Sequence, residues 1–443
     1  MDSVTKLSKI QPGIVKVRGW IEKVTLFKKH SFVILRDGVG KHSHIQVYIP
    51  TKVASSDILV TESYTEVEGN VRALPSTAFS FRPFELEATK VTILGTSDSD
   101  FPSRCPSEAG SDIKMEERHL YIRDPKFAVI TKLRSILVRS LREHFEDTGC
   151  TEVFPPSFVG NQCEGGATLF KLDYPDKEKG DIPAYLTQSS QFYLEYVLPG
   201  IGDSFCIAPS FRAERSQTRR HLTEFLHAES EWSGILTLEE HLDKLSVLVK
   251  DTVAKFLHYG RNYLDELELT PRVEKLLQMC DDIKIVTHKE AIEYCRIHQI
   301  YKDADTKTYF EYEDDIPEMQ ERKMIDEMDK IVFLIRFPKG FKSFYFSTFE
   351  DGTVLGCDVE VPGVGEIIGS GVREYDLSKL QIAIEAAGLN KEEYREYLDI
   401  RKYGAGRTSG MGLGVDRFLT WLLGCFSIRD VVTFPRVPGR LFP

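Results

Sequence analysis

The sequence predicts an α+β protein in which a small N-terminal antiparallel β-barrel precedes a larger domain built on an antiparallel sheet flanked by helices. Two patterns lead to this prediction. Short alternating or apolar runs, separated by Gly, Pro and polar clusters, fill residues 14–95, whereas an apolar period of three to four residues begins near residue 127. The length of 443 residues agrees with two to three units at roughly 150 residues per domain.

The N-terminal elements are five short strands. They read IVKVRGWI, SFVILRD, HIQVYI, YTEVEGNV and ATKVTIL. Five strands with this spacing favour an OB-fold, whose exposed sheet face binds unpaired bases. We therefore predict an OB-fold over residues 1–95. A linker or hinge is predicted over 96–125, because GTSDSDFPSRCPSEAGS is rich in Gly, Ser, Asp and Pro.

Residues 126–443 are predicted to form one larger domain. A long amphipathic helix opens it, with apolar residues every three to four positions over 127–145. Two T-x-x-E capping boxes, at 237–240 and 287–290, begin helices within a helical insertion at about 236–330. The elements that follow are four strands, IVFLIRFP, KSFYFSTF, GCDVEV and GEIIGSG, and a final helix over 417–424.

Charge is distributed unevenly along the chain. Residues 1–95 contain 13 Lys/Arg and 9 Asp/Glu, a balance of +4, so with −11 for the whole chain the other 348 residues carry −15. A basic N-terminal unit suits contact with nucleic acid, because neutralised phosphates supply much of such affinity. No apolar run is long enough to span a membrane, and MDSVTKLSKI lacks the apolar core of a secretory signal. Eight cysteines without a C-x-x-C pair indicate reduced thiols. We therefore expect a cytosolic protein.

Phosphate chemistry is indicated by FRAERSQTRRHLTEF at 211–225, which contains four arginines and a histidine. A planar guanidinium binds phosphate through two N–H groups and keeps its charge. The sequence lacks G-x-x-x-x-G-K-[ST], which excludes a P-loop, and GAGRTSG does not have the spacing of a dinucleotide fold.

Three segments carry a family resemblance. Motif 2 of the class II aminoacyl-tRNA synthetases resembles FRAE (211–214) together with RRHLTEF (219–225). Motif 3 resembles GMGLGVDRF (410–418), and motif 1 is matched by Pro155 and Pro156. Further segments are similar to asparaginyl-tRNA synthetases of the cytosolic eukaryotic and archaeal type, within the aspartate, asparagine and lysine subgroup. These segments are EGGATLFKLDY, LTQSSQFYLE, HAESE, FKSFY, VGEIIGS and RKYG.

The resemblance implies a class II catalytic domain, an anticodon-binding role for the OB-fold, and a homodimer formed through motif 1. It implies ATP-dependent attachment of asparagine to its tRNA through an asparaginyl adenylate, with release of AMP and pyrophosphate. It also implies that the protein acts in the cytoplasm and binds neither a membrane nor DNA. In the family, catalysis depends on positioning and electrostatic stabilisation rather than on a protein nucleophile.

The resemblance also implies an ATP site. The catalytic pair is Arg212, at the α-phosphate, and Arg417, at adenine and the γ-phosphate. The other ATP-binding residues implied are Glu214, which contacts ATP, Arg220 and His221, at the terminal phosphates, and Phe225, stacked on adenine. Mg²⁺ would bridge the phosphates, held by Glu366 and Asp358. Gly369 stands where aspartyl enzymes have a metal-binding serine.

The resemblance further implies that the enzyme selects asparagine over aspartate. Leu194 occupies the position of the lysine that pairs with the substrate carboxylate in aspartyl enzymes, and Glu229 replaces an aspartate. In the asparaginyl family such a glutamate accepts a hydrogen bond from the side-chain NH₂, and an arginine matched by Arg373 donates to the amide oxygen. The remaining amino-acid-binding residues implied are Glu164, Ser189 and Gln191.

Two side chains of the OB-fold match the family's readers of the central anticodon base. Phe32 in SFVILRD would stack on that base, and Gln46 in HIQVYI would hydrogen bond to it. The sequence departs from the family where Arg407, Thr408 and Ser409 replace Pro-His-Gly, and where Asp416 replaces glutamate.

Three alternatives stay open. One is a non-discriminating aspartyl enzyme; another is a tRNA-independent enzyme of the asparagine synthetase type, which residues 14–95 disfavour. The third is a non-catalytic RNA-binding paralog, which the retention of Arg212 and Arg417 disfavours.

Overall fold

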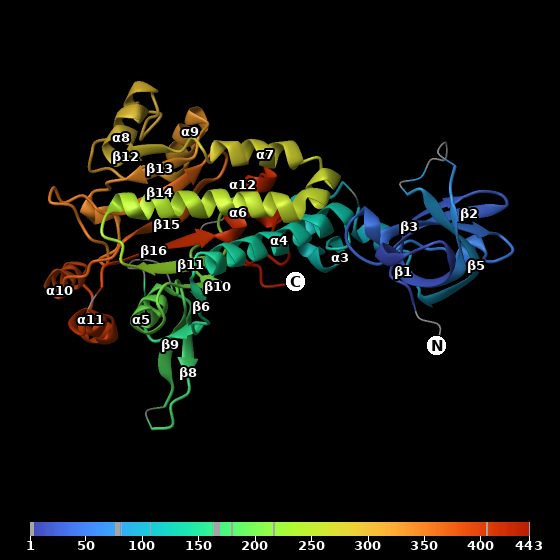
Figure 1. Cartoon of the computed structure of the whole chain (residues 1–443), viewed down its shortest axis with the longest axis horizontal. Helices are drawn as coiled ribbons and strands as arrows, with labels where there is room; N and C mark the ends of the chain where they lie inside the picture. Colours follow the sequence, from blue (N-terminus) through green and yellow to red (C-terminus); the bar gives the residue numbers. More distant parts are fainter. Residues whose placement is uncertain are drawn as a thin grey trace. The chain divides into compact units, whose positions relative to one another are not determined.

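The computed structural model describes residues 4–75, 80, 82–106, 108–161, 163, 169–178, 180–215, 218–404 and 406–442. The chain forms two compact units, Met1–Lys132 with the last two residues, and Leu133–Leu441. Figure 1 labels most of the helices and strands of both units. Among the described helices, none has both the length and the apolar composition needed to cross a membrane.

The first unit contains a closed five-stranded barrel. In chain order its strands are β1 (Gly13–Leu26), β2 (His30–Arg36), β3 (His44–Pro50), β4 (Tyr64–Ala73) and β5 (Phe84–Gly95). They close in the order β1-β2-β3-β5-β4, with β3 and β5 parallel and the other pairs antiparallel. Alternate residues point inward and fill the barrel, and Val17, Leu35 and Leu86 are fully buried there. The predicted OB-fold is confirmed.

Three short helices follow the barrel in the first unit: α1 (Phe101–Arg104), α2 (Ser111–Glu116) and α3 (Arg118–Tyr121). Arg36 and Arg123 both contact the Glu62 carboxylate, at 2.7 Å and 3.3 Å, and so join the end of this segment to the barrel. The end of the segment predicted as a linker is therefore tied to the barrel at Arg123.

The second unit is built on an eight-stranded sheet. Its strands are β6 (Thr151–Glu152), β10 (Ser204–Phe211), β11 (Glu224–Ser233), β12 (Lys284–Thr287), β13 (Val332–Ile335), β14 (Gly356–Val361), β15 (Gly365–Val372) and β16 (Thr408–Gly414). The order is β12-β13-β14-β15-β16-β11-β10-β6. Neighbouring strands are antiparallel except for the two edge pairs, β12 with β13 and β6 with β10, which are parallel. The predicted antiparallel sheet is confirmed, with a parallel strand added at each edge.

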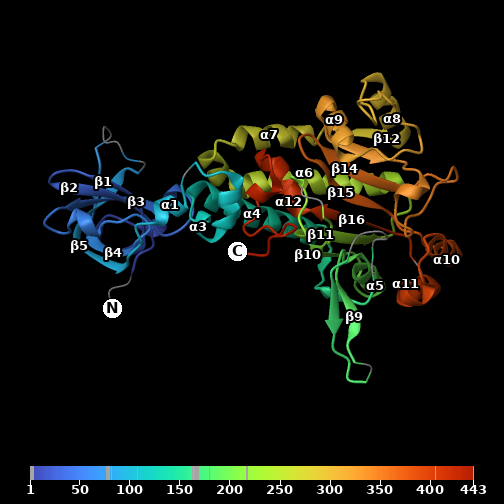
Figure 2. The ribbon, with the colours of Figure 1, turned by 180° about the vertical axis from the view of Figure 1, so that it is seen from behind.

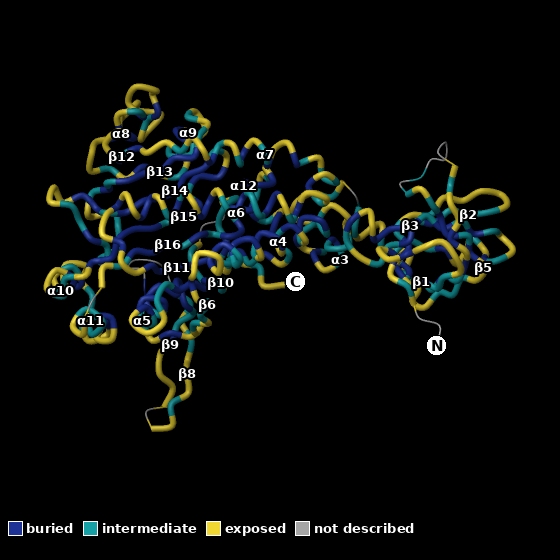
Figure 3. The backbone as a smooth tube through the Cα atoms, viewed as in Figure 1, coloured by how far each residue is buried: buried dark blue, intermediate teal, exposed yellow. Residues whose placement is uncertain are grey.

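Helices flank this sheet. They are α4 (Pro125–Asp147), α5 (Gln191–Ile201), α6 (Leu238–Glu266), α7 (Thr270–Met279), α8 (His288–Ile297), α9 (Glu318–Met328), α10 (Leu377–Ala386), α11 (Arg395–Lys402) and α12 (Val415–Leu423). In Figure 1 the long helix α6 runs across the front of the strands, and in Figure 2, seen from behind, the strands lie in front of it. The central strands are the buried layer, and the outer helices carry the exposed residues (Figure 3). A smaller sheet, in the order β7 (Phe158–Val159), β9 (Ile182–Leu186), β8 (Lys171–Tyr174), lies beside α5.

Two local predictions differ from the structure. The helical region at 236–330 also contains β12, a strand of four residues that joins the sheet edge. KSFYFSTF at 342–349 is not a strand and makes only isolated bridges at Phe346 and Thr348. Its aromatic rings pack instead against Tyr394 and Tyr397, so tertiary packing explains the apolar run.

Candidate active site

One cavity of about 220 Å³ in the second unit gathers most of the side chains implied by the resemblance. Those that line it are Ser189, Gln191, Arg212, Glu214, Arg220, His221, Phe225, Glu229, Asp358, Glu366, Arg373 and Arg417. Phe32 and Gln46 lie on the barrel of the first unit. Glu164 lies outside the described residues.

Strands β10 and β11 position one side of the cavity. They pair antiparallel from Ser204 with Glu231 to Phe211 with Glu224, and the Arg212 amide continues the ladder by donating to the Thr223 carbonyl at 3.0 Å. This pairing brings the Arg212 guanidinium to 5.4 Å from the Phe225 ring centroid. The cation and the aromatic face therefore meet at the end of the hairpin.

The opposite side comes from β15 and α12. Arg417, in the first turn of α12, donates through Nη1 to the Glu366 carbonyl at 3.0 Å and lies 3.4 Å from the Glu366 carboxylate. Its Nε donates to the Arg220 carbonyl at 3.4 Å, which links α12 to the arm after β10. Arg212 and Arg417, 205 positions apart in the sequence, thus line the same cavity.

Two carboxylates face each other across Gly369. A Cβ at this glycine would lie 3.0 Å from Glu366 Oε1 and 3.9 Å from Asp358 Oδ1, and that Asp358 oxygen is buried without a hydrogen-bond partner among the described residues. Lys342 contacts the other Asp358 oxygen. Burial raises the pKa of Asp358 to about 6, and Lys342 opposes this shift. Burial also favours neutral Glu366, but Arg417 and Lys342 hold its pKa below the usual value.

This pair fits Mg²⁺, which is commonly held by one or two carboxylates while phosphates and waters complete its shell. Gly369 provides the space in which an oxygen-bound cation could contact both side chains. The described residues contain no group of three or more His, Cys, Asp and Glu side chains placed to hold a metal by themselves.

Helix α9 adds acidic groups that the sequence analysis did not assign to the site. Glu318 Oε1 lies 3.0 Å from Arg220 Nε, and Arg220 Nη1 donates to the Val364 carbonyl at 3.2 Å. Asp326 accepts a hydrogen bond from the Gly363 amide at 2.6 Å, which fixes the turn between β14 and β15.

Burial and the charges of Arg417 and Arg220 lower the pKa of His221.

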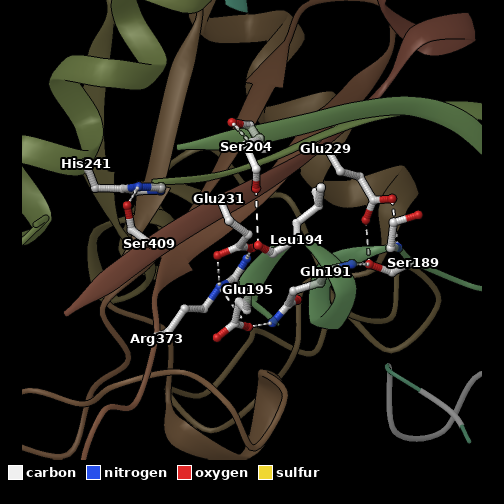
Figure 4. Close-up of polar contacts among 12 residues, drawn as sticks. Ser189, Gln191, Leu194, Glu195, Ser204, Glu229, Glu231, His241, Arg373 and Ser409 are labelled. Atoms are coloured by element: carbon white, nitrogen blue, oxygen red, sulfur yellow. Dashed lines mark hydrogen bonds and ion pairs between the residues drawn. The ribbon is translucent and has the colours of Figure 1, made fainter. Parts of the chain in front are cut away.

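The other end of the cavity is built around Glu229 on β11. This side chain is only 3% exposed, and its carboxylate accepts hydrogen bonds from the Ser189 hydroxyl at 2.5 Å and the Ser190 amide at 2.8 Å (Figure 4). Both donors stand at the start of α5, next to Gln191. A buried acceptor is thus held in place at the wall of the cavity.

Arg373 is anchored by a carboxylate that the sequence analysis missed. Its Nε donates to Glu231 at 3.1 Å, and its Nη2 donates to the second oxygen of the same side chain (Figure 4). Glu231 lies in the segment HAESE, but no local sequence pattern shows that it meets Arg373. Burial raises the pKa of Glu231 to about 8, and the Arg373 guanidinium, which donates to both carboxylate oxygens, opposes this shift and favours the charged form.

The glycines of β16 make room for these side chains. A Cβ at Gly410 would collide with the Glu231 carboxylate, and one at Gly412 would collide with the His227 ring.

Asp416, which stands where the family has glutamate, accepts hydrogen bonds from Arg134 Nε at 2.9 Å and from the Leu226 amide at 3.1 Å. The shorter acid therefore still ties α12 to α4 and β11.

Comparison with known proteins agrees with this geometry. The family model described as tRNA synthetases class II (D, K and N) matches residues 110–438. The cytoplasmic asparagine–tRNA ligase of Dictyostelium discoideum is 38% identical over 440 residues, which is 97% of this chain and 65% of that protein. The human cytoplasmic asparagine–tRNA ligase is 37% identical over 436 residues, 97% of this chain and 77% of that protein.

Solved structures of this family superpose over nearly the whole chain. The asparaginyl-tRNA synthetase of Entamoeba histolytica in complex with asparaginyl-adenylate has a TM-score of 0.87 at 32% identity and covers 99% of each chain. The Pyrococcus horikoshii enzyme, complexed with the same adenylate, has a TM-score of 0.87 at 32% identity and covers 100% of each chain. The chain therefore belongs to the class II tRNA synthetases of the D, K and N group and, within it, to the asparaginyl-tRNA synthetases, the ligases that join asparagine to tRNA.

Proposed function

We propose that this chain activates asparagine with ATP and Mg²⁺ and transfers it to its tRNA in the cytoplasm as a homodimer. The observation that carries the proposal is the convergence of Arg212 and Arg417 on one cavity whose far end holds Glu229. Such a cavity has cations for a triphosphate beside an acceptor for a carboxamide. The asparaginyl-adenylate bound by the two solved relatives is the intermediate that this chemistry produces.

Activation of the amino acid requires its carboxylate to attack the α-phosphate of ATP while pyrophosphate leaves. Arg212 would bind the α-phosphate, since negative charge increases on those oxygens during the attack. Arg417 and Phe225 would hold adenine between a guanidinium and a ring. Arg220, His221 and Glu214 would orient the rest of the triphosphate. The protein would accelerate the step by positioning and by electrostatics.

Mg²⁺ would be held by Glu366 and Asp358, and it would neutralise charge on the phosphates when bound. Lys342, in contact with Asp358, would keep that carboxylate turned toward the nucleotide. The orphaned Oδ1 of Asp358 supports this assignment, because a buried carboxylate oxygen without a partner is costly.

Recognition of asparagine would use one acceptor and one donor. Glu229 would accept from the side-chain NH₂, and Arg373 would donate to the amide oxygen. Ser189 and Gln191 would complete the pocket, with Glu164 as a further candidate. Leu194, fully buried, brings no cation to α5, which disfavours an aspartate-selective enzyme.

Recognition of tRNA would begin at the barrel. Phe32 lies 5.2 Å from the His30 ring and 5.6 Å from the Tyr48 ring, so a half-buried aromatic platform surrounds it. Gln46 donates to Glu85 at 2.8 Å. Stacking on such a platform is how single-stranded bases are commonly bound, and these contacts support anticodon reading by Phe32 and Gln46.

A homodimer is supported by exposed aromatic side chains near the motif 1 prolines. Phe154 is 86% exposed and Phe158 is 55% exposed, on either side of Pro155 and Pro156. Exposed apolar groups gathered in one segment commonly mark an interface. Sedimentation of the purified chain should give twice the monomer mass, and a strictly monomeric active enzyme would rule the dimer out.

Transfer of labelled asparagine to tRNA tests the proposal as a whole. Purified protein with ATP and Mg²⁺ should charge asparagine-accepting tRNA with asparagine and should leave it uncharged with aspartate. Charging with aspartate at a comparable rate would favour the non-discriminating aspartyl alternative. Formation of free asparagine from aspartate and ammonia without tRNA would favour the synthetase-type alternative.

A further inference from the structure

Glu195 is a buried carboxylate with no role in the chemistry described so far. It lies one helical turn after the start of α5 and is 2% exposed. It accepts hydrogen bonds from Gln191 Nε2 at 3.0 Å, the Tyr397 hydroxyl at 2.9 Å and Arg401 Nη2 at 2.5 Å. Its Oε1 also lies 4.0 Å from Arg373 Nε. Glu195 therefore touches two side chains that line the amino-acid end of the cavity (Figure 4).

The charges around Arg373 are balanced. Two buried carboxylates, Glu231 and Glu195, face two buried guanidiniums, Arg373 and Arg401. The two contacts of Glu231 occupy two of the five N–H groups of Arg373. A substrate carboxylate would therefore meet a guanidinium whose charge is already compensated, and it would have to be desolvated without gaining a free cation. A neutral amide oxygen needs only one remaining N–H donor.

We infer that Glu195 is a positioning residue which, together with Arg401, keeps the surroundings of Arg373 neutral and so makes the pocket select a carboxamide over a carboxylate. The inference rests on the proposed function, because it assigns Arg373 to the substrate side chain. Helix α5 thus contributes an anion at Glu195 and an apolar side chain at the preceding Leu194.

A charge cycle tests this inference. Glu195→Gln keeps the shape and an acceptor oxygen but leaves the four-residue network with one excess positive charge; Arg401→Gln leaves one excess negative charge; the double variant is neutral again. One unit charge several ångströms away from a substrate carboxylate changes its binding by roughly tenfold or more. Pyrophosphate exchange should therefore show a roughly tenfold rise in the aspartate-to-asparagine ratio of kcat/KM for Glu195→Gln.

The other members of the cycle separate charge from packing. Arg401→Gln should show no rise, and the double variant should return to the wild-type ratio. In all three the KM for ATP should stay unchanged. Glu152→Gln is the matched control, because it removes a carboxylate paired with an arginine, Arg142, at 2.9 Å, and neither residue lines the cavity. Its ratio should equal that of the wild type.

The outcomes are distinct. If Glu195→Gln keeps the wild-type ratio, or if every variant only loses asparagine activity, Glu195 is structural and the inference is wrong. If Glu195→Gln does not fold, the double variant must still show a higher ratio than Arg401→Gln, since these two differ only by the charge at position 195; equal ratios overturn the inference. A wild type that activates no asparagine would instead refute the proposed function.

Discussion

Replacing Glu229 by glutamine changes one carboxylate oxygen at the amide end of the cavity into an NH₂ group with little change in shape. In the structure one oxygen accepts from the Ser189 hydroxyl and the other from the Ser190 amide. The backbone amide of Ser190 can only donate, so the glutamine oxygen must face it. The new NH₂ must then face both Ser189 and the substrate NH₂. The Ser189 hydroxyl can rotate to accept a hydrogen bond from it, but the substrate NH₂ can only donate, so two donors face each other.

The cost follows from these contacts. A hydrogen bond to a charged acceptor contributes about 1.5–3 kcal/mol, and a buried donor left without an acceptor costs about 1–3 kcal/mol more. Together these terms raise the barrier for asparagine by about 3–5 kcal/mol, which corresponds to a loss in kcat/KM of roughly 10²- to 10⁴-fold. The KM for ATP should remain within about twofold, because Glu229 is assigned no nucleotide contact.

The assay is asparagine-dependent exchange of pyrophosphate into ATP, with kcat and KM measured for each substrate. Ser189→Ala is the control, since it removes one donor to Glu229 but keeps the carboxylate; we expect a loss of roughly tenfold from the misplaced acid. If Glu229→Gln keeps its kcat/KM for asparagine within about threefold, the carboxylate does not accept from the substrate amide and the reasoning is refuted.

Three further predictions concern other parts of the chain. Arg417→Ala should lower the rate of adenylate formation by roughly 10²- to 10³-fold, measured in a single turnover with saturating ATP; a rate within tenfold of wild type would remove Arg417 from the chemistry. Phe32→Ala should raise the KM for tRNA by roughly tenfold through the loss of one base stack and leave pyrophosphate exchange without tRNA unchanged, so an equal effect on both would argue against an anticodon role. Burial lowers the pKa of His241 to about 3 from 6.5, so the ring is neutral when folded and takes up a proton on unfolding below about pH 6.5. The stability linked to His241 is therefore complete above pH 6.5 and decreases by roughly 1.4 kcal/mol per pH unit as the pH falls toward 3. Urea midpoints of the wild type and His241→Gln should converge as the pH is lowered from 7.5 to 5, and parallel curves would contradict the assignment.

Local patterns made the fold readable. Each barrel strand has one buried face, so inward-pointing residues such as Val17 and Leu35 alternate with residues that are less buried, and this alternation indicates a strand. Strand β12 has four residues, too few to establish a period beside long helices. The run at 342–349 has the composition of a strand, but its aromatic residues pack in a cluster with Tyr394 and with Tyr397 of α11. Such tertiary packing cannot be read from a single segment.

The candidate site was readable where its residues are close in sequence. Arg212, His221 and Phe225 fall within fifteen positions, and the hairpin of β10 and β11 brings them together. Pairs that join distant segments were not readable: Glu231 meets Arg373 across 142 positions, and Glu195 meets Arg401 across 206. The sequence contains 57 Lys and Arg and 68 Asp and Glu residues, and ion-pair partners cannot be predicted from their positions in the sequence alone. Only the packing of α5, β11, α11 and the segment after β15 establishes those pairs.

The central claim is that one cavity binds a triphosphate and a neutral carboxamide together. Pyrophosphate exchange by the purified chain with ATP and Mg²⁺, compared between asparagine and aspartate, tests it most directly. The account predicts exchange that depends on asparagine, with a kcat/KM for aspartate lower by roughly 10³-fold or more, since a site that pairs a specific polar group rejects the analogue that leaves it unpaired. Equal exchange with both amino acids, or none with asparagine, would contradict it.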